Sequence, residues 1–161
     1  MTDDQVTAGG EIAADSPLAP DVRELLGRHL AFTTATSPPE DMHALDADRL
    51  LDPAVQFFSF RRDGVLLGVG ALKRLDGEHA EVKSMHTAQG ARGGGVGRAM
   101  LEHLLAVARE HGYRRVSLET GSMAEFGPAR ALYASAGFVR CEPFADYRPS
   151  PNSTFMTLAL A

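Results

Sequence analysis

Cysteine is almost absent from this chain, and Cys141 is its single representative. One thiol excludes an internal disulfide framework, and it also excludes a metal site built from several cysteines. Proteins without disulfides are typical of reducing compartments. We therefore expect a cytoplasmic protein.

Long apolar runs and an excess of basic residues are missing as well. No apolar run approaches the roughly 20 residues that a membrane-spanning helix needs, so we expect neither a membrane contact nor a signal peptide. The net charge of −5 argues against nucleic acid as a partner, because nucleic-acid binding draws on a basic surface. No set of His, Asp and Glu has the spacing of metal ligands, and we expect no metal.

What the sequence does contain is typical of one soluble globular domain. Its 161 residues are 44% hydrophobic and 23% charged, which suffices for a single core. Residues 1–10 are acidic or small, and we expect them to be disordered. No repeat or linker divides the chain, so one domain should span residues 1–161.

The hydrophobic pattern predicts an α/β protein with a mixed sheet. Asp-Gly pairs at 63–64 and 76–77 mark the two turns of an antiparallel meander. A strand-helix-strand crossover follows the meander, and helices should cover both faces of the sheet. The expected strands are 11–14, 55–61, 65–75, 80–87, 115–120, 138–141 and 154–160, and the expected helices begin at Asp21, His43, Val96 and Ala129.

A glycine-rich loop (residues 89–98) joins the last strand of the meander to a strongly amphipathic helix. Backbone without side chains lets N–H groups converge on a ligand, and a helix N-terminus and arginines add positive charge. The alternative is a plain flexible turn, but the helix that follows favours a site for a phosphate-bearing ligand. The candidate binding residues are Arg92, Gly93, Gly94, Gly95, Val96, Gly97 and Arg98.

The spacing within this loop separates the phosphate ligands. The loop lacks the Gly-Lys-Ser/Thr ending of a P-loop, and the third glycine of the dinucleotide fingerprint is missing. What remains is R-x-x-G-x-G, formed by Arg92, Gly95 and Gly97. A second motif lies downstream, where residues 131–138 read A-L-Y-A-S-A-G-F.

With these two motifs the chain resembles the GNAT superfamily of acyl-CoA-dependent N-acetyltransferases. The resemblance implies a GNAT-like fold whose glycine-rich loop holds the pyrophosphate of acetyl-CoA, the acyl-donor co-substrate. It also implies that an acetyl group moves to a primary amine of a small molecule or peptide, by direct attack in a ternary complex. The alternative is a non-catalytic module that binds or senses acyl-CoA.

The resemblance also assigns catalytic roles. Tyr133 matches the family's general acid, which protonates the leaving thiolate; the alternative is a core aromatic residue. Glu81 lies on the strand where the family places a catalytic glutamate, and we expect it to be the general base. A salt bridge from Glu81 to Lys83 or to an arginine is the alternative.

The end of the same strand should hold the rest of the donor. Backbone N–H groups of Met85, His86 and Thr87 are expected to bind the pantetheine amides and the oxyanion. Strand alternation places Glu81, Lys83, Met85 and Thr87 on one face, and Val82, Ser84 and His86 on the other.

Candidate residues for binding the acceptor amine come from several separate parts of the sequence. Residues 37–46 resemble a bacterial subgroup of small-molecule acetyltransferases, which makes Glu40 and His43 candidates for substrate binding; helix capping is the alternative. Glu119 is a second candidate carboxylate, with structural pairing as its alternative. Phe126 replaces an asparagine of many relatives and could wall the acyl pocket. The last strand could pair across a homodimer.

Overall fold

The computed structural model describes residues 10–27, 49–88, 95–122, 124–145 and 147–160. Residues 20–27 are helical. The remaining elements are β1 (Gly10–Ala14), η2 (Arg49–Leu51), β2 (Val55–Arg62), β3 (Val65–Arg74), β4 (His79–Thr87), α3 (Val96–Glu110), β5 (Arg115–Gly121), η4 (Ala124–Phe126), α4 (Gly127–Ser135), β6 (Val139–Arg140) and β7 (Ser153–Ala159). Within these ranges, no helix is long and apolar enough to cross a membrane.

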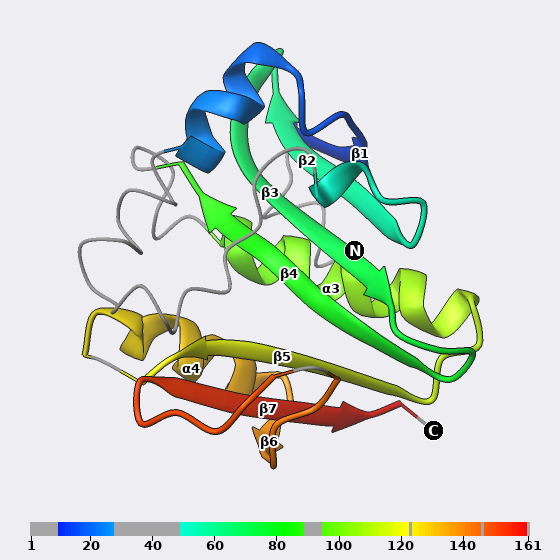
Figure 1. Ribbon diagram of the computed structural model, residues 1–161. Coiled ribbons are helices and arrows are strands. Elements are labelled where there is room, and N and C mark those ends of the chain that lie inside the picture. Colours follow the sequence, from blue (N-terminus) through cyan, green and yellow to red (C-terminus); the bar gives the residue numbers. More distant parts are fainter. Residues whose placement is uncertain (1–9, 28–48, 89–94, 123, 146, 161) are drawn as a thin grey trace.

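The strands within the described residues form one seven-stranded sheet in the order β1-β2-β3-β4-β5-β7-β6. Strands β1 to β4 form an antiparallel meander, and β5 is antiparallel to β7. Of the described strands, only β4 and β5 pair in parallel, since α3 carries the chain from one to the other (Figure 1). The predicted α/β class and mixed sheet are confirmed.

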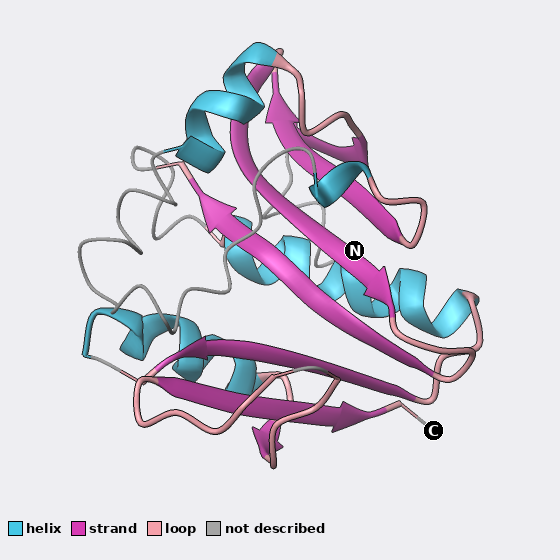
Figure 2. Cartoon of the chain, in the orientation of Figure 1, coloured by secondary structure: helices cyan, strands magenta, loops and turns pink. Residues whose placement is uncertain are grey.

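Helices pack on both faces of the sheet, as expected. Helices α3 and α4 share one apolar core with β3, β4, β5 and β7, and α3 runs along the back of β3 and β4 in Figure 2. The helix at residues 20–27 and η2 form a second core with Phe57 and Val69 on the other face. Glycine at position 70 lets α3 approach β3 closely, because a Cβ there would lie 2.6 Å from Met100 Cγ.

The ends of several elements differ from the prediction. Gly10 already pairs with Arg62, so β1 begins one residue before the expected strand and inside the segment predicted to be disordered; residues 1–9 lie outside the described residues. Strand β6 has two residues and excludes Phe138. The reason is that Gly137 is left-handed and Phe138 N–H donates to the Tyr133 carbonyl, so both residues belong to the end of α4.

Candidate active site

Strands β4 and β5 separate from each other in the middle of the sheet. They pair over three residues each, ending at Glu81 and Ser117, yet β4 continues to Thr87 and β5 to Gly121. Figure 1 shows the two strands diverging toward their carboxyl ends. Among the described strands, none therefore pairs with the edge of β4 beyond Glu81 on this side. In open α/β sheets, ligands bind at such carboxyl ends.

A β-bulge interrupts β4 just beyond this point. Ser84 and Met85 together stand opposite Gly70 of β3, where regular pairing would place one residue. Ser84 accordingly adopts a left-handed conformation, with φ of 55°. A bulge bends its strand and re-aims the side chains that follow.

The bulge makes the predicted alternation along β4 wrong. Met85 packs into the core under α3, and the Thr87 hydroxyl lies 3.6 Å from the position that a Cβ on Gly97 of α3 would take. Glu81 and Lys83 lie on the opposite face. The extra residue resets the two-residue period, so the four side chains expected on one face are divided between two.

Glu81 is buried in a small polar cluster. Its side chain is only 3% exposed, and Lys83 Nζ lies 3.0 Å from Glu81 Oε2. The same oxygen accepts a hydrogen bond from the Tyr147 hydroxyl, and Lys83 Nζ also donates to that hydroxyl at 2.9 Å. The salt bridge considered as the alternative for Glu81 is thus present. A buried carboxylate is stable only with such partners.

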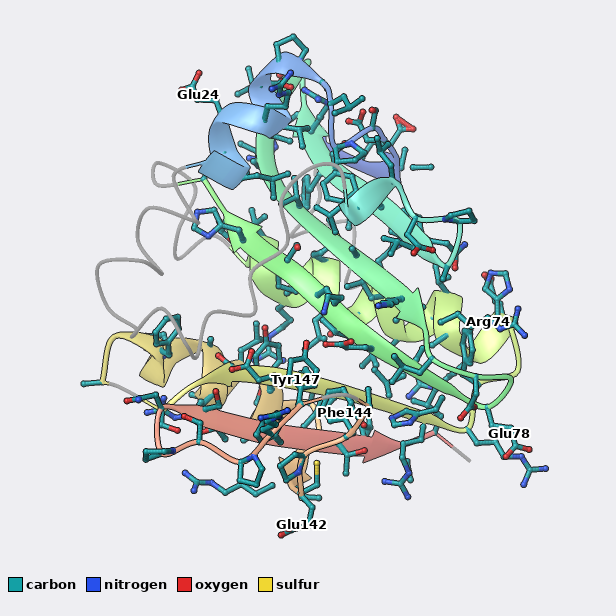
Figure 3. The ribbon with its side chains drawn as sticks, in the orientation of Figure 1. Glu24, Arg74, Glu78, Glu142, Phe144 and Tyr147 are labelled. Atoms are coloured by element: carbon teal, nitrogen blue, oxygen red, sulfur yellow. The ribbon has the colours of Figure 1, made fainter. Side chains whose placement is uncertain are left out.

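Tyr147 reaches this cluster from the segment between β6 and β7, 66 residues away in the sequence. Its N–H donates to the Phe144 carbonyl across a tight turn in which Ala145 has φ of 51°. Its ring packs against Phe144 and Phe155, with centroids 5.1 and 5.5 Å apart. Tyr147 and Phe144 are labelled in Figure 3, beside β5 and β7. Sequence reasoning missed Tyr147, because this segment has no periodic pattern and no motif.

Tyr133 lies on α4, on the other side of the sheet. Its ring is buried against Phe138, with centroids 5.9 Å apart. Burial, helped by the negative charge of Glu119, raises the pKa of Tyr133 to about 12. The hydroxyl is therefore protonated at neutral pH, and no described residue hydrogen-bonds to it. The hydroxyl is thus available to donate a hydrogen bond or a proton to a bound ligand.

Glu119 lies on β5, directly opposite Phe155 of β7. Its charge contributes to raising the pKa of both Tyr133 and Tyr147. Glu119 therefore lies within electrostatic reach of the two tyrosines, one on each side of the sheet. Among the predicted site residues, the structure brings Tyr133, Glu81 and Glu119 into one neighbourhood.

The N-terminus of α3 lies beside the carboxyl end of β4. Gly95 caps the helix with φ of 83°, a left-handed conformation that favours glycine, and among the described residues no side-chain capping bond to the first N–H groups is found. Val96 is buried, and Arg98 donates to the Ser135 hydroxyl of α4 at 3.0 Å. Arg92, Gly93 and Gly94 lie outside the described residues.

The remaining predicted site residues are scattered. His86 pairs with Val69 of β3, and Phe126 covers Gly121, where a Cβ would overlap the phenylalanine ring. Phe126 thus packs at the end of β5, next to the point where β4 has diverged. Glu40 and His43 lie outside the described residues.

Comparison with known proteins agrees with this geometry. The Acetyltransferase (GNAT) family model matches residues 21–138. The chain is 50% identical over 139 residues to YsnE of Bacillus subtilis (strain 168), covering 86% of this chain and 92% of the relative. It is 44% identical over 149 residues to YedL of Escherichia coli (strain K12), covering 92% and 94%. Both relatives are named uncharacterized N-acetyltransferases.

The fold is also shared with solved structures. A GNAT family acetyltransferase from Elizabethkingia anophelis, solved with acetyl-CoA bound, superposes with a TM-score of 0.70 at 17% identity. That match covers 94% of this chain and 99% of the other. Family model, relatives and fold agree, and the chain belongs to the GNAT family as an acetyl-CoA-dependent N-acetyltransferase.

Proposed function

We propose that this protein transfers the acetyl group of acetyl-CoA to a primary amine of a small molecule or peptide, by direct attack in a ternary complex. The observation that carries the proposal is the place of Glu81. A buried carboxylate lies at the last pair of β4 and β5, where the strands diverge. An enzyme that deprotonates an amine beside a thioester uses a general base within reach of that amine, and a carboxylate can serve as this base.

Glu81 serves as the general base in this proposal. Its hydrogen bonds from Lys83 and Tyr147 both go to Oε2. No described residue donates to Oε1, so this second oxygen can accept the amine proton, directly or through one water. The nitrogen lone pair then attacks the thioester carbonyl carbon.

Tyr133 serves as the general acid. As the tetrahedral intermediate collapses, the C–S bond breaks and the departing thiolate takes the Tyr133 proton. The nitrogen loses its extra proton as the amide forms, and this proton restores the Tyr133 hydroxyl. The raised pKa of Tyr133 keeps its hydroxyl protonated at neutral pH, so the hydroxyl is available to donate to the negative charge that develops on the sulfur. No covalent intermediate with the enzyme is needed, because amine and thioester meet in one complex.

The donor-binding residues fit acetyl-CoA. Beyond Glu81 no described strand pairs with the edge of β4 that faces β5, so backbone groups of Met85 and Thr87 can bind the pantetheine amides and the oxyanion. The N–H groups after Gly95, which no described side chain caps, suit the pyrophosphate. Arg92 stays a sequence-based prediction for the same group. The cytoplasmic location and a homodimer stay predictions of the sequence.

The test is release of free thiol from acetyl-CoA in the presence of a panel of primary amines, with the product identified by mass. We expect release that depends on one amine class, and an amine that gains 42 Da, about the mass of an acetyl group less one hydrogen. Glu81→Gln should lower kcat by about 100-fold or more. An amine-independent baseline throughout the panel, with acetyl-CoA still raising the melting temperature, would contradict the proposed reaction.

A further inference from the structure

We propose that Tyr147 is a positioning residue for Glu81, and that the segment between β6 and β7 is therefore part of the catalytic apparatus. The inference rests on the proposed function, because it assigns Tyr147 a role through the base of that reaction. Tyr147 holds one oxygen of Glu81 and thereby leaves the other oxygen for the acceptor amine.

The hydrogen bonds around Glu81 form a closed triangle. Lys83 Nζ donates to Glu81 Oε2 at 3.0 Å and to the Tyr147 hydroxyl at 2.9 Å, and that hydroxyl donates to the same Oε2. Two donors on one oxygen fix the plane of the carboxylate. Lys83 alone could not do so, because a flexible ammonium is a point charge without directional preference.

The scaffold behind Tyr147 is rigid enough for this role. Edge-to-face packing with Phe144 holds its ring, and Phe155 anchors Phe144 in turn, with centroids 6.0 Å apart. The left-handed backbone of Ala145 is a conformation that costs an alanine free energy. Such a turn persists where the surrounding packing requires it, and here the result is a phenol that points at a buried carboxylate.

The chemistry of the phenol supports a donor role. Burial, with the charge of Glu81 and the hydrogen bond to it, raises the pKa of Tyr147 well above its usual value. Tyr147 therefore keeps its proton throughout the pH range of enzyme assays. A phenolate would repel Glu81, whereas a protonated phenol holds it.

The test is a double-mutant cycle on Tyr147→Phe and Glu81→Gln, measured as kcat and KM with acetyl-CoA and the amine that the wild-type protein uses fastest. Tyr147→Phe keeps the ring and removes only the hydroxyl. We expect kcat to fall about tenfold, with the KM for acetyl-CoA unchanged. Tyr113→Phe is the matched control, since Tyr113 lies after α3 against His111, and it should leave kcat unchanged.

The cycle separates positioning from the other roles. If Tyr147 acts through Glu81, Tyr147→Phe has no further effect on kcat in the Glu81→Gln background. Equal fold losses in both backgrounds would overturn the inference, because Tyr147 would then act independently of Glu81. Unchanged kcat in the single variant would overturn it as well. A wild-type protein that acetylates no amine refutes the proposed function itself, and the inference falls with it.

Discussion

Replacing Lys83 with methionine should destabilise the protein strongly, because it removes the cation from a buried ion pair. The Lys83 side chain is 9% exposed and that of Glu81 3%. Removing one partner of such a pair typically costs 3–5 kcal/mol, since the remaining charge is left without compensation. Tyr147 still donates to Glu81 Oε2 in the variant, which places the expected loss near the lower limit, at about 3 kcal/mol.

This loss can be measured by urea denaturation at pH 7, with the slope checked to be unchanged. A loss of about 3 kcal/mol lowers the melting temperature of a domain of this size by roughly 6–12 °C. Lys73→Met is the control. Lys73 is the other lysine of the chain and pairs with Glu81 across β3 and β4, but it makes no ion pair with it among the described residues. Its loss should cost less than about 1 kcal/mol.

Combining Lys83→Met with Glu81→Gln then tests why the Lys83 substitution destabilises the protein. If the cost comes from an uncompensated charge, the double variant Glu81→Gln/Lys83→Met should be more stable than the sum of the single losses predicts, by about 2 kcal/mol. A Lys83→Met loss under about 1 kcal/mol, or strict additivity of the two substitutions, would refute this reasoning.

Three further predictions concern the donor site, the acid and the N-terminal half. Gly95→Asp should weaken acetyl-CoA binding more than about 100-fold in titration calorimetry, because it strains a left-handed cap and adds a negative charge, whereas Gly77→Asp in an open turn should not. Tyr133→Phe should lower kcat about 10- to 100-fold at unchanged acetyl-CoA affinity, and unchanged turnover would remove Tyr133 from the acid role. Arg61→Met should flatten the loss of stability in acid, as followed by denaturation between pH 5 and 2.

The direction of the change expected for Arg61→Met follows from the pKa values of two aspartates, Asp15 and Asp21. Hydrogen bonds from Arg61 lower the pKa of Asp21. Burial opposes a similar shift at Asp15, but hydrogen bonds from Ser59, the Ser16 N–H and Arg61 outweigh it and lower the pKa of Asp15. Carboxyls with lowered pKa stabilise the fold above their unfolded value near 3.8, and this contribution disappears as the pH falls through the lowered value. Equal acid sensitivity of Arg61→Met and wild type would contradict the assignment.

Much of the fold could be predicted because local chemistry fixes it. The Asp63-Gly64 pair marks the hairpin between β2 and β3, and Gly64 indeed adopts a positive φ of 80°. The helix after the glycine-rich loop begins at Val96, as its apolar spacing indicates. Such features depend on neighbouring residues alone, so one sequence suffices to find them.

Other features depend on contacts between distant residues. The bulge at Ser84 has no glycine or proline to mark it, and it arises where β4 pairs with β3 on one side and leaves β5 on the other. Tyr147 comes from an irregular segment, and only the tertiary fold places it on Glu81. The salt bridge of Glu81 and Lys83 was partly predictable. Their two-residue spacing suggested the contact, but only the tertiary fold shows that the pair is buried.

The most direct test of the proposed roles of Glu81 and Tyr133 is a crystal structure of the protein with acetyl-CoA and a non-reactive analogue of its acceptor. We predict that the thioester lies between the diverging ends of β4 and β5, with its sulfur within hydrogen-bonding distance of the Tyr133 hydroxyl. The nitrogen of the acceptor should lie on the side of Glu81 Oε1, directly or through one water. A thioester held away from Tyr133, or an acceptor that approaches from a face without Glu81, would contradict these roles.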